Sequence, residues 1–100
     1  MNQFEELIKG ETPVLVDFYA DWCGPCRMMP PILQEVKKAY GDDLTIIKVD
    51  VDRNRAVSMQ YAIRSIPTIM LFHNGEVAWR HTGVASAVQI KQAVDALLVK

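Results

Sequence analysis

The chain has 100 residues, half of them hydrophobic and 23% charged, with a formal net charge of -1. This predicts a globular protein with one domain over residues 1–100, and it argues against nucleic acid or an anionic membrane as the main partner. The acidic start lacks the features of a signal peptide, and no apolar run is long enough to span a bilayer. We therefore expect a cytoplasmic location, although a chain whose signal peptide had been removed would look the same.

Helices and strands are expected to alternate along the chain. Apolar residues at helical spacing predict the helices, and short apolar runs predict the strands. Asn74-Gly75 is a strong hairpin signal between the last two strands, and Ser86 with Gln89 forms a capping box before the last helix. The expected order is helix, strand, helix, strand, helix, strand, strand and helix, over residues 2–10, 14–19, 24–40, 44–51, 52–61, 68–73, 76–82 and 86–98.

The connections between these elements set the expected topology. Strands joined through helices should be parallel, and the hairpin then adds one antiparallel strand, 76–82. Apolar central strands need cover on both faces. We therefore expect an α/β fold, a mixed sheet of three parallel strands and one antiparallel strand with helices on both faces. The 24–40 helix should be kinked by two prolines, Pro30 and Pro31, and should pack through an apolar row, Met28, Ile32, Val36 and Tyr40.

Cys23 and Cys26 are the only cysteines, and they lie where a strand gives way to a helix. A thiolate rather than a thiol attacks a disulfide, and free N–H groups at a helix start stabilise an anion. We therefore expect the pKa of Cys23 to be lowered, and Cys26, one turn further in, to be more shielded. In this scheme Cys23 attacks a substrate disulfide, and Cys26 then attacks Cys23 to release the reduced product.

A buried cysteine pair without redox chemistry and half of a zinc site are the alternatives. Structural zinc usually takes four ligands, so His73 and His81 would have to complete the set. With a two-residue hairpin turn, His73 pairs with Glu76. His81 then pairs with Thr68, which places the two histidines ~16 Å apart along the ladder. One ion cannot bind both, so the pattern favours redox chemistry and no metal site.

Five further features of the sequence, taken with their spacing along the chain, match a known family: Val16–Met28, Lys48–Asp52, Ile66–Thr68, Asn74-Gly75 and Gly83. Together they resemble the thioredoxin family over about residues 4–98. The resemblance implies a dithiol that reduces disulfides in client proteins and binds no cofactor of its own. It also implies that a flavin-dependent thioredoxin reductase recharges the dithiol from NADPH.

The resemblance assigns roles to two charged residues. Asp17 lies within an apolar strand, so burial should raise the pKa of its carboxyl, unless the residue faces a polar edge. By resemblance, Asp17 lies behind Cys26 and accepts its proton. Lys48 resembles the family's lysine near that aspartate, and a lysine that merely extends its stem along a strand is the alternative.

The resemblance also implies a surface on which clients dock. A cis bond between Ile66 and Pro67 would turn the Ile66 backbone toward the cysteines, where it can pair with an extended peptide. The expected hairpin register places Gly83 opposite Ile66, and a residue without a side chain leaves room beside the site. The implied docking surface is flat and apolar and comprises Trp22, Gly24, Pro25, Ile66, Pro67 and Gly83.

The start of the chain departs from the family pattern. Only 16 residues precede Asp17, too few for the strand that typical members carry before their first helix. We therefore expect four strands in the spatial order 44–51, 14–19, 68–73 and 76–82, with 44–51 as an exposed edge. Because uncovered apolar edges invite pairing, either the chain dimerises there or another element shields the edge.

Trp79 and Ser65 also differ from the usual family residues. Trp79 is expected to pair with Met70 and to cover the sheet face, with a role in binding a partner as the alternative. Ser65 stands where a glycine is common. Gly24 and Pro25 between the cysteines resemble the reductants of the family. An oxidant or isomerase on the same fold is one alternative. A non-catalytic interaction module that docks partners on the flat face is the other.

Overall fold

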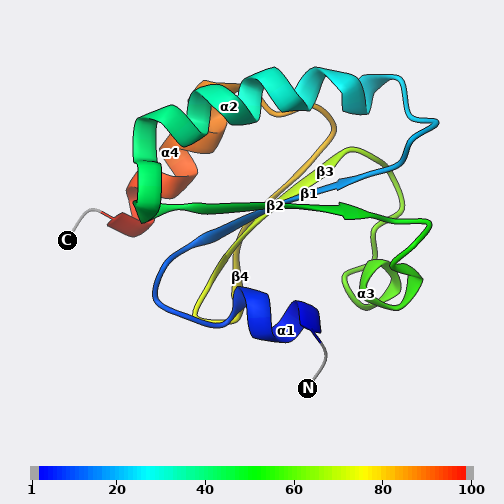
Figure 1. The fold of residues 1–100 in the computed structure, drawn as a ribbon, viewed down its shortest axis with the longest axis horizontal. Helices are drawn as coiled ribbons and strands as arrows, with labels where there is room; N and C mark the ends of the chain where they lie inside the picture. The colour runs from blue at the N-terminus through cyan, green and yellow to red at the C-terminus, as the bar shows by residue number, and fades with distance from the viewer. Residues whose placement is uncertain (1–2, 99–100) are drawn as a thin grey trace.

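The structure, a computed structural model, describes residues 3–98, and its elements follow the expected order (Figure 1). Asn2, the expected start of the first helix, lies outside the described residues. No helix within residues 3–98 is long and apolar enough to cross a membrane. Two 3-10 turns, η1 and η2, flank α2. The elements are α1 Gln3–Ile8, β1 Val14–Tyr19, η1 Pro25–Met28, α2 Met29–Tyr40, η2 Gly41–Asp43, β2 Thr45–Asp50, α3 Arg55–Gln60, β3 Thr68–His73, β4 Glu76–Thr82 and α4 Ala87–Leu98.

The four strands form one mixed sheet in the order β2-β1-β3-β4, which confirms the predicted spatial order. The predicted directions are wrong in one respect. β1 and β2 are parallel, but β3 is antiparallel to both β1 and β4, so the single reversed strand is 68–73 rather than 76–82. Asp50 at the end of β2 lies beside Tyr19, and Thr68 at the start of β3 lies beside Phe18. The connection between β2 and β3 therefore stays at one end of the sheet, and β3 starts where β2 finishes.

The β3–β4 hairpin begins as predicted, with His73 opposite Glu76. Its register then shifts by one residue, because Phe72 pairs with Val77 while Leu71 pairs with Trp79. Three predicted pairings beyond the shift are therefore wrong by one position. His81 lies opposite Ile69 instead of Thr68, and Trp79 lies opposite Leu71 instead of Met70. Gly83 was expected opposite Ile66, but its N–H donates to the Pro67 carbonyl.

Helices cover both faces of the sheet, with α2 and α4 on one side and α1 and α3 on the other (Figure 1). Successive β1 residues face opposite sides, so Leu15 packs under α2 and α4 while Val16 and Phe18 pack under α1 and α3. Trp79 is half-buried against the α2/α4 core and stacks on His81, with ring centroids 5.8 Å apart. The indole therefore covers the sheet face, as predicted.

The predicted 24–40 helix is divided into η1 and α2 rather than kinked. Pro30 and Pro31 fall in the first turn of α2, where backbone N–H groups have no helical acceptor, so they mark its start. The division also changes which residues of the helix face the core. Met29, Leu33 and Val36 are the buried residues of α2, whereas Met28, expected to be buried, is 58% exposed.

The two reciprocal hydrogen bonds of the predicted capping box are present at the start of α4. The N–H of Gln89 donates to Ser86 Oγ at 3.1 Å, and the N–H of Ser86 donates to Gln89 Oε1 at 2.9 Å. Ile90 and Val94 are the buried residues of the helix that follows. Leu98, expected in the same stripe, is 38% exposed.

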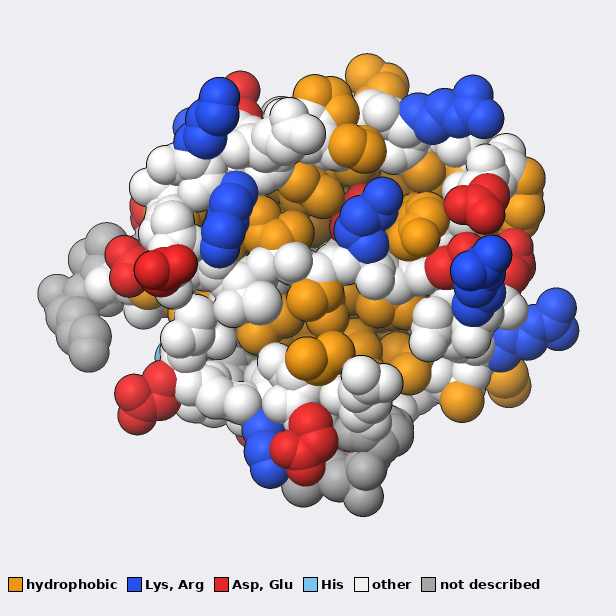
Figure 2. All heavy atoms as spheres, in the orientation of Figure 1, with side chains coloured by type: hydrophobic (Ala, Val, Ile, Leu, Met, Phe, Trp, Pro, Cys, Tyr) orange, Lys and Arg blue, Asp and Glu red, His pale blue; other side chains and the backbone are white. Residues whose placement is uncertain are grey.

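β2 is an exposed edge of the sheet within the described residues, and the segment before β1 forms α1 rather than a further strand. A groove of about 490 Å³ beside Ile47 separates β2 from α1 and α3, and a groove of about 420 Å³ beside Ile46 separates it from α2. Figure 2 shows apolar side chains above and below the band along which β2 runs. Lys48 lines both grooves. The predicted edge position of this strand is confirmed within the described residues, but Leu44, expected at the exposed start of the strand, lies before β2 and is buried.

Candidate active site

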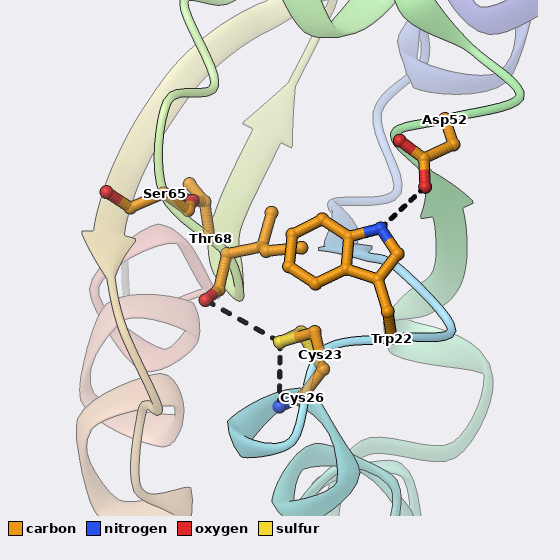
Figure 3. The surroundings of a disulfide bond; sticks show 7 residues. Trp22, Cys23, Cys26, Asp52, Ser65 and Thr68 are labelled. Carbon is orange, nitrogen blue, oxygen red and sulfur yellow. Dashed lines mark hydrogen bonds between the residues drawn. A yellow bond between two sulfur atoms is a disulfide. The ribbon is translucent and has the colours of Figure 1, made fainter.

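The cysteine pair lies between the end of β1 and the start of α2. The sulfurs of Cys23 and Cys26 are bonded, and their Cα atoms are 5.4 Å apart. The backbone N–H of Cys26 donates to Cys23 Sγ at 3.2 Å, and the carbonyl oxygen of Ile66 lies 3.7 Å from the same sulfur. Both contacts converge on Cys23 in Figure 3. A backbone donor aimed at this sulfur can stabilise negative charge on it.

The two cysteines are buried to the same extent. Cys23 is 4% exposed and Cys26 is 5% exposed, so the expectation that Cys26 is more shielded is wrong at this level. The chain turns back sharply before η1, where the N–H of Cys23 donates to the Ala20 carbonyl, and this turn buries Cys23 as well. The two sulfurs differ in their polar contacts instead, because Cys23 Sγ receives the Cys26 N–H and lies 3.7 Å from the Ile66 carbonyl oxygen.

Asp17 is fully buried in the centre of the sheet, which excludes the alternative that it faces a polar edge. It shares the face of Leu15, the face that α2 and α4 cover, because the two residues are two positions apart on β1. Neither carboxyl oxygen has a hydrogen-bond partner within the described residues. Burial raises the pKa of Asp17 to about 6, and the positive charge of Lys48 opposes this rise. The predicted rise is confirmed, and the group can exchange a proton near neutral pH.

Lys48 lies on β2 in register with Asp17 on β1. Its ammonium stands 4.4 Å from the centroid of the Tyr19 ring, a cation–π distance. Lys48, Tyr19 and both cysteines line a cavity of about 190 Å³. The structure thus brings the predicted lysine to the cysteine pair. Tyr19 is a residue that sequence reasoning missed, although the parallel register of β1 and β2 could have indicated it.

The predicted docking residues gather around Cys23, although Gly83 sits one residue off its predicted register. The Ile66–Pro67 peptide bond is cis, the isomer that the resemblance implies. Gly83 has a φ of 97°, which favours glycine, and its N–H donates to the Pro67 carbonyl at 2.8 Å. The Thr68 hydroxyl, on the residue after the proline, donates to the carbonyl of Ser65, two residues before it, at 2.6 Å. These bonds fix the backbone that carries the Ile66 carbonyl.

Trp22 is 71% exposed at the rim of the site, beside the exposed Gly24 and Pro25. Its indole N–H donates to Asp52 Oδ2 at 2.8 Å, as Figure 3 shows. This bond holds a large apolar ring open to solvent beside Cys23. Asp52 is a second residue that sequence reasoning missed as part of the site, since no local pattern links positions 30 residues apart.

No group of three or more potential metal ligands lies within residues 3–98. A cysteine pair after a central strand, with the backbone before a cis-proline against Cys23, is typical of a thiol–disulfide oxidoreductase on an α/β sheet. A sequence model of the family described as Thioredoxin matches residues 1–96. The chain belongs to the thioredoxin family.

Individual relatives agree with this assignment. The chain is 49% identical over 91 residues to thioredoxin 1 of Synechococcus elongatus, covering 91% of this chain and 85% of that protein. It is 43% identical over 98 residues to the chloroplastic thioredoxin Y of Oryza sativa subsp. japonica, of which it spans only 58%. The crystal structure of oxidised mitochondrial thioredoxin 3 from Saccharomyces cerevisiae superposes with a TM-score of 0.83 at 32% identity. That match covers 94% of this chain and 87% of the yeast one.

Thioredoxins are protein-disulfide oxidoreductases and dithiol electron donors, and they carry no cofactor of their own. The chain is accordingly a thiol–disulfide oxidoreductase with its redox chemistry in the CxxC pair. The two sulfurs of Cys23 and Cys26 are sufficient to exchange two electrons with a disulfide.

Proposed function

We propose that the chain, as a single domain, reduces disulfides in client proteins, with Cys23 as the nucleophile. The observation that carries this proposal is the 3.2 Å hydrogen bond from the Cys26 N–H to Cys23 Sγ, which favours a thiolate at that sulfur. The Cys23 thiolate attacks one client sulfur. The client disulfide breaks, a Cys23–client disulfide forms, and the other client sulfur leaves as a thiolate and takes up a proton.

Cys26 completes the cycle as the resolving thiol. Asp17 accepts the Cys26 proton, and the resulting thiolate attacks Cys23 Sγ. The Cys23–Cys26 disulfide forms, and the second client sulfur leaves as a thiolate and takes up a proton, so two electrons have passed to the client. Support for the proton transfer comes from the pKa of about 6 at Asp17 and from the cavity that Lys48 shares with both cysteines. Lys48 keeps the carboxylate form accessible near neutral pH.

Client recognition is proposed for the surface around the cis-proline. The Ile66 carbonyl faces Cys23, so an extended client segment can pair with this backbone while presenting its disulfide to the sulfur. Exposed apolar residues frame the approach, and Gly83 leaves space on the far side. The docking surface consists of Trp22, Gly24, Pro25, Ile66, Pro67 and Gly83.

Replacement of Cys26 with Ser is expected to trap a covalent complex with a disulfide protein such as insulin. Without the resolving thiol, the Cys23–client disulfide persists, and non-reducing electrophoresis with mass spectrometry detects it. Cys23→Ser is the matched control and should trap nothing, while both variants should lose turnover. Trapping by Cys23→Ser but not by Cys26→Ser would reverse the assignment of roles.

We propose that thioredoxin reductase recharges the dithiol from NADPH and that the chain works in the cytoplasm. Gly24 and Pro25 resemble the family's reductants, and a chain whose only cysteines form a CxxC pair fits a reducing compartment. The test is insulin reduction coupled to NADPH oxidation by a thioredoxin reductase. A non-catalytic binding module would give no NADPH oxidation, and a dedicated oxidant would be reduced without passing electrons on.

We propose a monomer as the working form, with the β2 edge as the site where a second copy can pair. The β4 edge is protected by a register shift and by Glu76 and Arg80, whereas β2 carries one outward charge, Lys48, between two apolar grooves. Sedimentation velocity at low concentration should give a mass near 11.3 kDa. Ile46→Lys is expected to abolish any dimer formed at high concentration, and a dimer that survives this change would exclude pairing at β2.

A further inference from the structure

Arg80 on β4 reaches across the sheet end to the turn that follows α3. Its Nη1 donates to the Tyr61 carbonyl, and its Nη2 donates to the Ala62 carbonyl at 2.9 Å. Carbonyls at a helix C-terminus lack helical donors and carry the negative end of the helix dipole, so a guanidinium is favourable there. The planar fork of arginine binds the two neighbouring carbonyls through separate nitrogens in a fixed geometry, whereas a lysine ammonium is a single point charge on a flexible stem.

The turn held by Arg80 contains a residue in the left-handed region. The N–H of Ala62 donates to the Met59 carbonyl at 3.1 Å, and the N–H of Ile63 donates to the Ser58 carbonyl at 2.8 Å. This is the hydrogen-bond pattern of a Schellman motif, in which the left-handed position is usually glycine. Here Ala62 adopts it with a φ of 53°, against the steric preference of its Cβ. The two bonds from Arg80 therefore stabilise a turn that its own sequence disfavours.

β4 and the residue directly after it thus hold both ends of the segment that faces the cysteines. Arg80 on β4 fixes its start at Tyr61 and Ala62, and Gly83, which follows β4, fixes its end through the Pro67 carbonyl. The Ile66 carbonyl lies between these two anchors, 3.7 Å from Cys23 Sγ. A shift of the turn at Ala62 would reach Ile66 through only three intervening residues.

We propose that Arg80 is a positioning residue for client binding: its two bonds to the Tyr61 and Ala62 carbonyls hold the 62–67 segment so that the Ile66 backbone meets an extended client. This inference rests on the proposed docking of clients at Ile66. Arg80 touches neither cysteine, so it sets where a client segment lies and leaves the sulfur chemistry unchanged. A small aromatic disulfide needs no pairing with the Ile66 backbone, so its reaction rate does not depend on Arg80.

The test compares Arg80→Met with the wild type on two substrates, insulin and 5,5′-dithiobis(2-nitrobenzoate). For insulin, KM should rise about 5-fold with kcat within about 2-fold, because client binding is impaired and the chemical step is not. The rate with the small disulfide should stay unchanged. Arg55→Met is the matched control, since it removes an exposed arginine from the start of α3 with the same change in charge, and it should leave both substrates unaffected.

Rescue at Ala62 tests the role of the turn. Glycine adopts the left-handed conformation freely, so Ala62→Gly should remove the need for the guanidinium. In the Ala62→Gly background, Arg80→Met should raise the insulin KM less than about 2-fold. Arg80→Lys, which keeps the charge but not the fork, should fall between wild type and Arg80→Met.

Three outcomes would overturn the proposal: an unchanged insulin KM in Arg80→Met, an equal loss with both disulfides, or a failure of Ala62→Gly to rescue. A wild type that does not reduce insulin would instead refute the proposed function. Amide hydrogen exchange at Ile63 remains informative in that event. Its N–H bonds to Ser58 within the turn, so exchange should accelerate in Arg80→Met and recover with Ala62→Gly, whatever the client.

Discussion

Replacing Asp17 with Asn is expected to raise the free energy of unfolding by about 3 kcal/mol near pH 8 and by little near pH 4. The folded-state pKa of Asp17 is raised from 3.8 to about 6, chiefly by burial. The folded state therefore binds the proton more tightly than the unfolded chain. Ionising the buried carboxyl destabilises the fold progressively as pH rises from 3.8 through about 6, and the full penalty is present above that range. Asparagine stays neutral and avoids it.

Urea unfolding of the oxidised protein between roughly pH 4 and pH 8 measures this effect. Lys48→Met is the informative partner, because loss of its positive charge should raise the pKa of Asp17 further and destabilise the wild-type background above neutral pH. In the Asp17→Asn background the same change should lose its pH dependence. Unfolding curves of wild type and Asp17→Asn that stay parallel across this range would show that Asp17 does not titrate there.

The same substitution should slow the reaction that Asp17 serves. A positioned general base contributes about 100-fold or more, so release of insulin from the Cys23 mixed disulfide should slow by about that factor. Gain of stability and loss of turnover in one variant would show that the buried carboxyl is retained for proton transfer and not for the fold. A stabilised variant with unchanged release would leave the carboxyl without that role.

Local sequence signals predicted most of the scaffold. The apolar run of β1, the Asn74-Gly75 turn and the Ser86–Gln89 capping box are short-range patterns, and each appears in the structure. What they could not supply was the direction of β3. The connection over residues 51–67 is long enough for either direction, so its length in the sequence could not decide how β3 runs.

The missed parts of the site are long-range contacts. The register shift between Leu71 and Phe72 moved every later pairing by one residue, and a shift of this kind has no reliable signature in a single sequence. Asp52 bonds Trp22 across 30 positions, and Arg80 reaches back 18 positions to Ala62. The cysteines were evident because their spacing is local. The residues that position their surroundings became visible only when the sheet brought distant segments together.

Phe4→Ala is expected to destabilise the fold by about 3–5 kcal/mol, a large part of the stability of a domain of this size. Phe4 is 6% exposed and anchors the six-residue helix α1 on the sheet. Its ring lies 5.6 Å from the Tyr61 ring, 5.6 Å from Phe72 and 6.3 Å from Phe18, measured between centroids. A helix this short is not stable alone, so its position depends on burying this side chain.

Leu7→Ala on the same helix is the control, because Leu7 is 49% exposed, and its cost should stay within about 0.5 kcal/mol. Urea unfolding of the oxidised proteins compares the two, and folded Phe4→Ala should keep its reactivity with small disulfides, since α1 and α2 lie on opposite faces of the sheet (Figure 1). Equal losses in the two variants would mean that α1 as a whole, rather than its aromatic anchor, stabilises the fold. A large loss confined to Phe4→Ala would identify the aromatic ring as the anchor of α1 on the sheet.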